Sequence, residues 1–229
     1  MAEIIPAIMP KSFEDLENKI SAVVSRVSHV HIDLMDGKYV KNISWPYQPK
    51  DEYSLAMILA EQEGMPFWEK INFEFDLMVE NAHEHIATFI KMGASRLIFH
   101  LEAFNDTKEF LEFLEGIDQY DRENLAIGVA ILPSTSIEKI GSLIPYIDFV
   151  QCMGIEKIGY QGNPFDERVL DHVRHLREKF PGLTISVDGA VNMDTAGLLI
   201  DAGADRLVIG SAIFTTPDIH GVIDYFQSL

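Results

Sequence analysis

The chain has 229 residues, 47% of them hydrophobic, which is enough to build a sizeable core. Its formal net charge is −18, from 18 Lys and Arg against 36 Asp and Glu. The sequence also has no basic stripe with interleaved aromatic residues, so we do not expect it to bind nucleic acid. No apolar run approaches the ~20 residues that cross a bilayer, so no membrane association is expected.

The cysteine content and the start of the chain predict a reducing, cytoplasmic location. The single cysteine, Cys152, has no partner for an internal disulfide. The N-terminal sequence MAEIIPAIMPKSFEDLENK lacks the basic start and the unbroken apolar run of a signal peptide. No linker or low-complexity segment divides the chain, so we expect one domain over residues 1–229.

Short, β-rich apolar segments alternate with helix-like segments along the whole chain. The helix-like segments, such as 13–27 and 81–93, place apolar residues at i, i+3, i+4 and i+7. This alternation predicts a parallel sheet covered by helices, and eight units favour a single (βα)8 TIM barrel, with an open doubly wound sheet as the alternative. The expected strands are 3–9, 29–35, 71–79, 96–102, 125–132, 148–155, 183–189 and 206–212.

Two segments of the chain are nearly repeated. Residues 91–100 and 201–210 each end a helix, turn through Gly-Ala and enter a strand, so we expect a left-handed glycine in both turns. Such turns are also common helix-to-strand connectors in other α/β proteins, so the repeat supports the barrel without proving it.

A long connection over residues 36–70 is expected to be a decorated loop with a helix at 54–64. Its aromatic residues Trp45, Tyr53, Phe67 and Trp68 are candidates for an exposed apolar patch, which favours a homo-oligomer. Packing in the core or under a lid would explain these residues equally well.

Several charged residues stand inside or at the ends of apolar strands. His31 and Asp33 lie two apart on one strand, so their side chains point the same way, and Asp76, His100 and Asp188 lie near the ends of other strands. In a barrel these ends converge. Three carboxylates and an imidazole there would repel one another without a cation, so we expect one divalent metal ion, with hydrogen bonding to loop backbone as the alternative.

Glycine-bearing turns follow the last two strands. Gly189 closes one strand, and Gly210 and Ser211 close the next before a short helix-like segment. Backbone N–H groups after these strands commonly bind phosphate in this fold. We therefore expect a phosphorylated ligand in this corner; simple strand-to-helix turns are the alternative.

At these residues the chain resembles the ribulose-phosphate 3-epimerase family. The resemblance implies a TIM-barrel isomerase of carbohydrate metabolism that inverts carbon 3 of a ketose phosphate, converting ribulose 5-phosphate of the pentose phosphate series to xylulose 5-phosphate. HIDLMDG followed by LMV and VDG is the more specific part of the match, whereas AGAD with GSAIF alone is shared by many phosphate-binding barrels. The matching segments are 6–9 with Phe13, 30–42, 76–80, 99–103, 128–138, 186–192 and 202–214.

The resemblance also implies residue roles. Asp33 and Asp188 would exchange the roles of acid and base through an enediolate, and a metal ion held by His31, Asp33, Asp76 and Asp188 would stabilise that enediolate. The methionines Met35, Met78 and Met153 would lie beside the reacting centre, although core filling would also explain them. We expect His100, Gly159 and Gly162 to belong to the substrate pocket.

Departures from the family pattern fall near the expected chemistry. Ala7 and Pro10 stand where the family has serines, Leu132 stands where it usually has asparagine, and the loop after the sixth strand is one residue longer. Asp76 stands where the family has a histidine. A site of this type suits Zn, Fe, Mn or Co, and the additional carboxylate favours Mn or Mg.

Two other functions are compatible with the same residues. A metal-dependent aldolase or decarboxylase acting on a sugar phosphate could use the same barrel mouth with altered hydroxyl contacts. A non-catalytic sugar-phosphate-binding barrel is the second alternative, for which the replaced histidine is the main argument.

Overall fold

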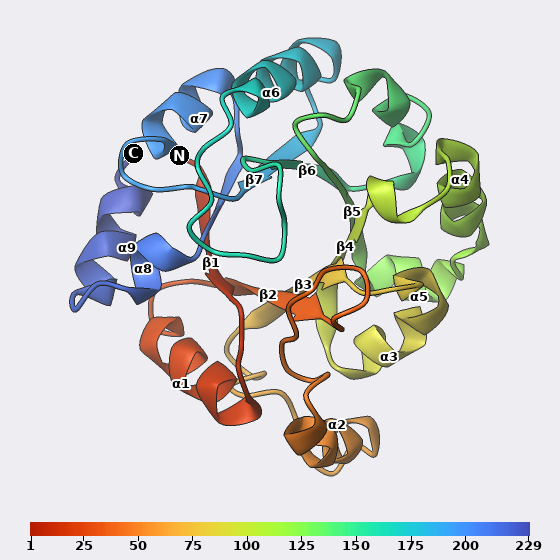
Figure 1. Cartoon of the computed structure of the whole chain (residues 1–229), viewed down its shortest axis with the longest axis vertical. Coiled ribbons are helices and arrows are strands. Elements are labelled where there is room, and N and C mark those ends of the chain that lie inside the picture. The colour runs from red at the N-terminus through yellow and green to blue at the C-terminus, as the bar shows by residue number, and fades with distance from the viewer.

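The computed structural model describes residues 1–229 and contains eight parallel strands that close into a barrel in sequence order (Figure 1). The last strand pairs with the first, Pro6 lying opposite Ile209, so the predicted TIM barrel is confirmed and the open sheet is excluded. The strands are β1 (Glu3–Ile8), β2 (His29–Met35), β3 (Asn72–Met78), β4 (Ala94–His100), β5 (Ala126–Ile131), β6 (Phe149–Met153), β7 (Thr184–Asp188) and β8 (Arg206–Ile209).

Helices form a ring around the outside of the barrel (Figure 1). None of them combines the length and the apolar character that a membrane-spanning helix requires. The connection from β5 to β6 contains two short 3-10 helices, at 137–140 and 144–146, and no α-helix. The helices are α1 (Phe13–Val23), α2 (Glu52–Leu59), α3 (Ile86–Lys91), α4 (Thr107–Gly116), α5 (Gln119–Asn124), α6 (Arg168–Lys179), α7 (Ala196–Ala202), α8 (Ser211–Phe214) and α9 (Ile219–Gln227).

Two expected helices are shorter than their apolar spacing predicted. The segment 81–93 starts with Asn81 in the left-handed region (φ 52°), continues as a 3-10 helix and becomes α-helical only at Ile86. Helix α2 ends at Leu59 rather than near 64, because Glu61 takes a left-handed conformation (φ 57°) that a helix cannot continue through.

The two faces of the strands have different chemistry. Alternate residues such as Ile32, Phe75 and Val129 point outward and form one apolar core with the helices. The other set points into the barrel, where polar side chains, among them Glu74 and Gln151, are fully buried beside a few small apolar clusters. The hydrophobic effect therefore acts mainly between strands and helices, and the interior of the barrel is left to charged and polar groups.

Both glycines of the near-repeat take the expected left-handed conformation, with φ of 85° at Gly93 and 112° at Gly203. We predict that Gly93→Ala lowers the free energy of unfolding by about 1 kcal/mol, because an L side chain is strained in this region although its Cβ would have space. The measurement is urea denaturation of both proteins.

Gly197→Ala is the matched control, because Gly197 lies in α7 with open space around it and no positive φ. It should leave stability unchanged or raise it slightly, since alanine favours helices. Equal stability of Gly93→Ala and the wild type would show that the turn tolerates a side chain.

Candidate functional site

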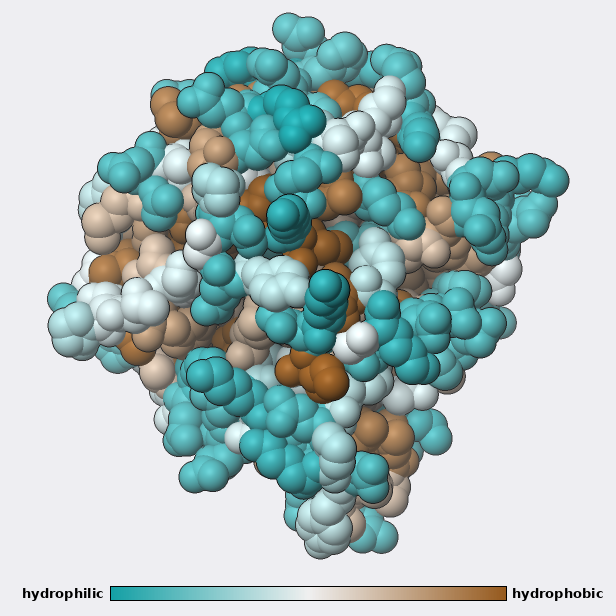
Figure 2. Space-filling view, viewed as in Figure 1, coloured by the Kyte–Doolittle hydropathy of each residue, from teal (hydrophilic) through white to brown (hydrophobic).

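A cavity of about 330 Å³ opens at the carboxyl ends of the strands. It lies under the loop from β6 to α6, which crosses the barrel mouth in Figure 1. In the same view, Figure 2 shows hydrophobic atoms near the centre of this face between more hydrophilic side chains. The cavity is therefore a partly covered pocket at the face where TIM barrels build their sites.

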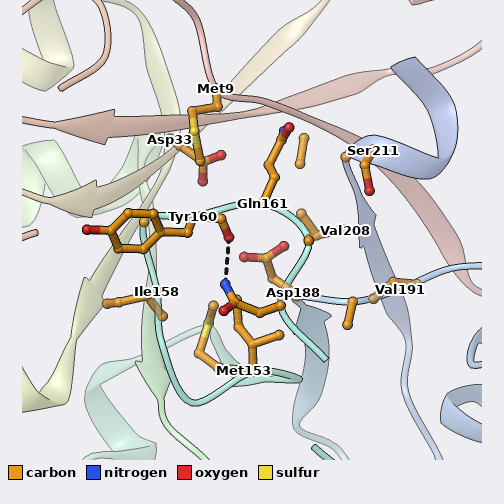
Figure 3. A pocket seen from close by; sticks show the side chains of 18 of the residues that line it. Met9, Asp33, Met153, Ile158, Tyr160, Gln161, Asp188, Val191, Val208 and Ser211 are labelled. Carbon is orange, nitrogen blue, oxygen red and sulfur yellow. Dashed lines mark hydrogen bonds between the residues drawn. The ribbon is translucent and has the colours of Figure 1, made fainter. Parts of the chain in front are cut away.

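The structure brings His31, Asp33, Asp76 and Asp188 together, with Asp33 and Asp188 in the wall of this cavity and His31 and Asp76 fully buried beside them. One ligand atom from each lies within 4.8 Å of those of the others. The strand register explains this: Asp33 lies opposite Asp76 on the neighbouring strand, and His31 points to the same side as Asp33. Asp188 comes from β7, across the barrel, and faces the same space (Figure 3).

The imidazole of His31 is held by a carboxylate on the side away from the cluster. Its Nδ1 lies 2.8 Å from Oε1 of Glu74, which is fully buried. Its Nε2 is buried without a hydrogen-bond partner and lies 3.4 Å from Asp33 Oδ1 and 3.6 Å from Asp76 Oδ2. Burial favours the neutral imidazole, but Asp33, Asp76 and Glu74 together raise the pKa of His31 well above its usual value.

Glu74 connects His31 to a second group of charges deeper in the barrel. Its other oxygen lies 3.3 Å from Nη1 of Arg96, whose Nη2 lies 3.4 Å from Glu3. Arg206 also binds Glu3, at 3.1 Å, and lies over the ring of Phe149. Glu74 is thus neutralised from two sides, which makes its complete burial possible.

Asp76 has its own fixed partners. His100 Nε2 lies 2.7 Å from Asp76 Oδ1, and the amide of Gln151 donates to Asp76 Oδ2 at 3.3 Å. Burial would raise the pKa of Asp76, yet His100 and His31 hold it well below its usual range. Asp76 is therefore an ionised carboxylate.

The remaining two carboxylates are destabilised as anions. Burial raises the pKa of Asp188 to about 7. Repulsion from Asp33 and Asp76 also raises this pKa, whereas His31 lowers it. Burial also raises the pKa of Asp33. The cluster holds more negative charge than His31 can neutralise.

A divalent cation fits this donor set. The imidazole nitrogen that faces the cluster has no partner in the protein, and three carboxylates offer oxygens to the same space. Imidazole nitrogens and carboxylate oxygens are common protein ligands of divalent metal ions. A cation here would neutralise groups that are otherwise buried at a cost.

Most of the other predicted site residues line the cavity, but two do not. Met35 and His100 are fully buried and do not line this cavity. His100 lies behind Asp76, and the backbone N–H of Met35 is bonded to the Ser44 hydroxyl. The predicted residues that do line it are Asp33, Met78, Met153, Gly159, Gly162, Asp188, Gly189, Gly210 and Ser211.

The positions that depart from the family pattern lie in different places relative to the cavity. Ala7 lines the cavity, whereas Pro10 is buried and its carbonyl accepts the backbone N–H of Trp45. Leu132 is partly buried, and its N–H donates to Glu102. Only Ala7 removes a side-chain hydrogen-bonding group from the cavity wall itself.

Two residues at the site were not selected from the sequence. Glu74 satisfies the criterion that selected Asp76, a charged residue inside an apolar strand, so the same criterion could have found it. Gln161 lines the cavity from the loop between β6 and α6, and no local sequence signal marks it.

Comparison with known proteins gives a consistent result. The model of the "Ribulose-phosphate 3 epimerase family" matches residues 3–214. The ribulose-phosphate 3-epimerase of Candida glabrata is 30% identical over 229 residues, covering 98% of this chain and 90% of that protein. The cytoplasmic isoform from Oryza sativa subsp. japonica is 28% identical, covering 97% and 91%.

Solved structures share the fold at lower identity. The 3-keto-L-gulonate-6-phosphate decarboxylase of Vibrio cholerae superposes with a TM-score of 0.68 at 13% identity, covering 99% of this chain and 96% of that one. At this identity the likeness concerns the barrel alone.

We predict that Glu74→Gln weakens Mn²⁺ binding about 10- to 100-fold, because partners behind a ligand histidine fix its tautomer and orientation. A glutamine amide could donate to Nδ1 and turn the wrong tautomer towards the cluster. Calorimetric titration with Mn²⁺ measures the affinity, and thermal unfolding checks that the barrel is intact.

Glu80→Gln is the control, because Glu80 is exposed, pairs with Lys38 at the surface and loses the same charge. It should bind Mn²⁺ like the wild type. If folded Glu74→Gln also bound Mn²⁺ like the wild type, Glu74 would have no part in orienting His31.

Proposed function

The chain belongs to the ribulose-phosphate 3-epimerase family, and we propose that Asp33 and Asp188 carry its reaction, the inversion of carbon 3 of ribulose 5-phosphate. The observation that carries this proposal is that the two carboxylates, from β2 and β7, approach one cavity from different sides (Figure 3). A carbon between them would be accessible to a carboxyl group on each face.

Inversion follows if the two carboxyl groups act on opposite faces. One carboxylate removes the proton from carbon 3, which leaves a planar enediolate, and the other delivers a proton from the far side. In the reverse reaction the two groups exchange roles.

The metal site lies directly beside these carboxylates. We propose His31, Asp33, Asp76 and Asp188 as the ligands of one divalent ion, in a family that depends on divalent metals. When bound, such an ion would polarise the substrate oxygens and offset the negative charge that develops in the enediolate. Glu74 holds the ring of His31, and His100 and Gln151 hold Asp76, so the ligands are oriented before the ion arrives.

The rest of the cavity suits a small phosphorylated sugar. Met78 and Met153 give an adaptable apolar wall beside the carboxylates, and Gly189, Gly210 and Ser211 line the corner proposed for the phosphate. The loop from β6 to α6 covers the opening (Figure 1), which limits the access of water to the enediolate.

We predict that the Mn²⁺-loaded protein converts ribulose 5-phosphate in heavy water to xylulose 5-phosphate carrying deuterium at carbon 3. Asp33→Asn and Asp188→Asn should each slow this exchange by at least about a hundredfold, because general acid–base catalysis contributes on that scale. NMR of the products measures both outcomes.

Asp194→Asn is the control, because Asp194 is an exposed carboxylate a few residues after Asp188. It should exchange deuterium at the wild-type rate. Release of carbon dioxide or carbon–carbon cleavage in place of exchange would instead support the decarboxylase or aldolase alternative, and binding without any reaction would support the non-catalytic one.

Asp76 allows a separate test of metal preference. We predict that Asp76→His raises the affinity for Zn²⁺ relative to Mn²⁺ about tenfold, because imidazole is a softer ligand than carboxylate. Competition titrations with both ions measure the ratio. An unchanged ratio in a folded variant would show that Asp76 does not set the preference.

We also make proposals about the location, the domain organisation and the self-association of the protein. We propose a cytoplasmic location, as the name of the rice relative states for that protein, and one folding domain over residues 1–229. Tyr53 and Trp68 are 71% and 64% exposed, which supports the proposal that the chain self-associates through this region. Trp45 is fully buried against Phe13 and cannot contribute to such a surface.

A further inference from the structure

The cavity has no cationic side chain with which to bind a phosphate. None of its lining residues is Lys, Arg or His, and Asp33 and Asp188 are acidic. The chain as a whole carries a formal charge of −18, which adds no long-range attraction for an anion. A phosphoryl dianion in this cavity must therefore be held by neutral N–H and O–H donors.

Three amide side chains line the cavity, and two of them are occupied. Asn163 donates to the carbonyls of Lys157 and Tyr160, at 3.0 and 2.9 Å. Asn192 donates to the carbonyl of Ala190 at 3.1 Å and caps the turn before α7. Gln161 is exposed and its side chain makes no hydrogen bond within the protein, so its two N–H donors are accessible to a ligand.

The free amide points to the corner of the cavity proposed for the phosphate. Figure 3 shows the Gln161 side chain extending from the loop towards the side on which Ser211 lies. Its Nε2 lies 3.8 Å from the position that a Cβ would occupy on Gly210. The absence of a side chain at Gly210 thus leaves room between the strand end and the amide.

The loop that carries Gln161 is fixed on both sides of it. Asn42 donates to the carbonyl of Gly159 at 2.7 Å, and Asn163 closes the turn on Tyr160. Gly159 has a φ of 81° and packs so closely on Val40 that a Cβ there would lie 2.9 Å from it. The backbone on either side of Gln161 is therefore held in place, which keeps the start of its side chain near the cavity.

We propose that Gln161 is a specificity-determining residue that donates its amide N–H to the phosphoryl group of the substrate at the Gly210–Ser211 corner. This inference rests on the proposed function for the identity of the sugar phosphate.

The test compares Gln161→Glu and Gln161→Ala with the wild type. Glutamate has nearly the same shape but repels the dianion, so KM for ribulose 5-phosphate should rise more than about tenfold, since hydrogen bonds to charged groups are among the stronger ones. Alanine should raise KM less, and kcat should change little in both. Exchange of free ribulose, which lacks the phosphate, should be the same in all three proteins.

A second readout does not require catalysis. Inorganic phosphate, titrated calorimetrically into each protein at the same Mn²⁺ concentration, should bind more weakly to both Gln161 variants than to the wild type. Gln62→Glu is the matched control, because Gln62 is exposed on the loop before β3 and undergoes the same change of charge. It should bind phosphate like the wild type.

The outcomes separate this inference from the proposed function. If the wild type exchanged no deuterium but Gln161→Glu still weakened phosphate binding, the reaction would be wrong and the role of Gln161 correct. Unchanged phosphate affinity in both Gln161 variants, or a fall in kcat with KM and phosphate affinity unchanged, would overturn the role of Gln161 whatever the reaction.

Discussion

The site depends on the hydrogen bond between His31 and Glu74 inside the barrel. A carboxylate without access to water is expensive unless a positive or hydrogen-bonding group neutralises it, and Glu74 has His31 on one side and Arg96 on the other. Because Glu74 takes Nδ1, the other nitrogen of His31 faces the carboxylates of Asp33 and Asp76. One buried contact thus sets the direction in which the imidazole presents its free nitrogen.

The same contact joins two layers of the barrel. Below it, Glu3, Arg96 and Arg206 form a network of ion pairs that closes the end of the barrel opposite the cavity. Above it, Asp33 and Asp76 lie side by side on neighbouring strands. Closure of the sheet fixes all these distances, since no strand can slip without moving every side chain to the wrong face.

Asp76 and Gln161 affect the balance of charge at the site. The carboxylate of Asp76 occupies the place of an imidazole, and His100 lies 2.7 Å behind it on the next strand. Asp76 therefore offers an oxygen to the cluster, and the imidazole of His100 holds that carboxylate from behind. In the covering loop, Gln161 presents an amide side chain to a cavity that is lined by no Lys, Arg or His.

The barrel fold could be predicted from the sequence because it follows from the alternation of short apolar segments with helix-like segments. The short apolar segments predicted all eight strands, and their number and their alternation with helix-like segments predicted the barrel. Charged residues within apolar strands, such as Asp76, also predicted the candidate metal site, because the ends of barrel strands converge. Tertiary structure alone decided that His100 lies behind Asp76, that Met35 lies outside the cavity and that Gln161 points towards Gly210. These facts depend on how strands and loops distant in sequence approach one another, and no local pattern of residues records that approach.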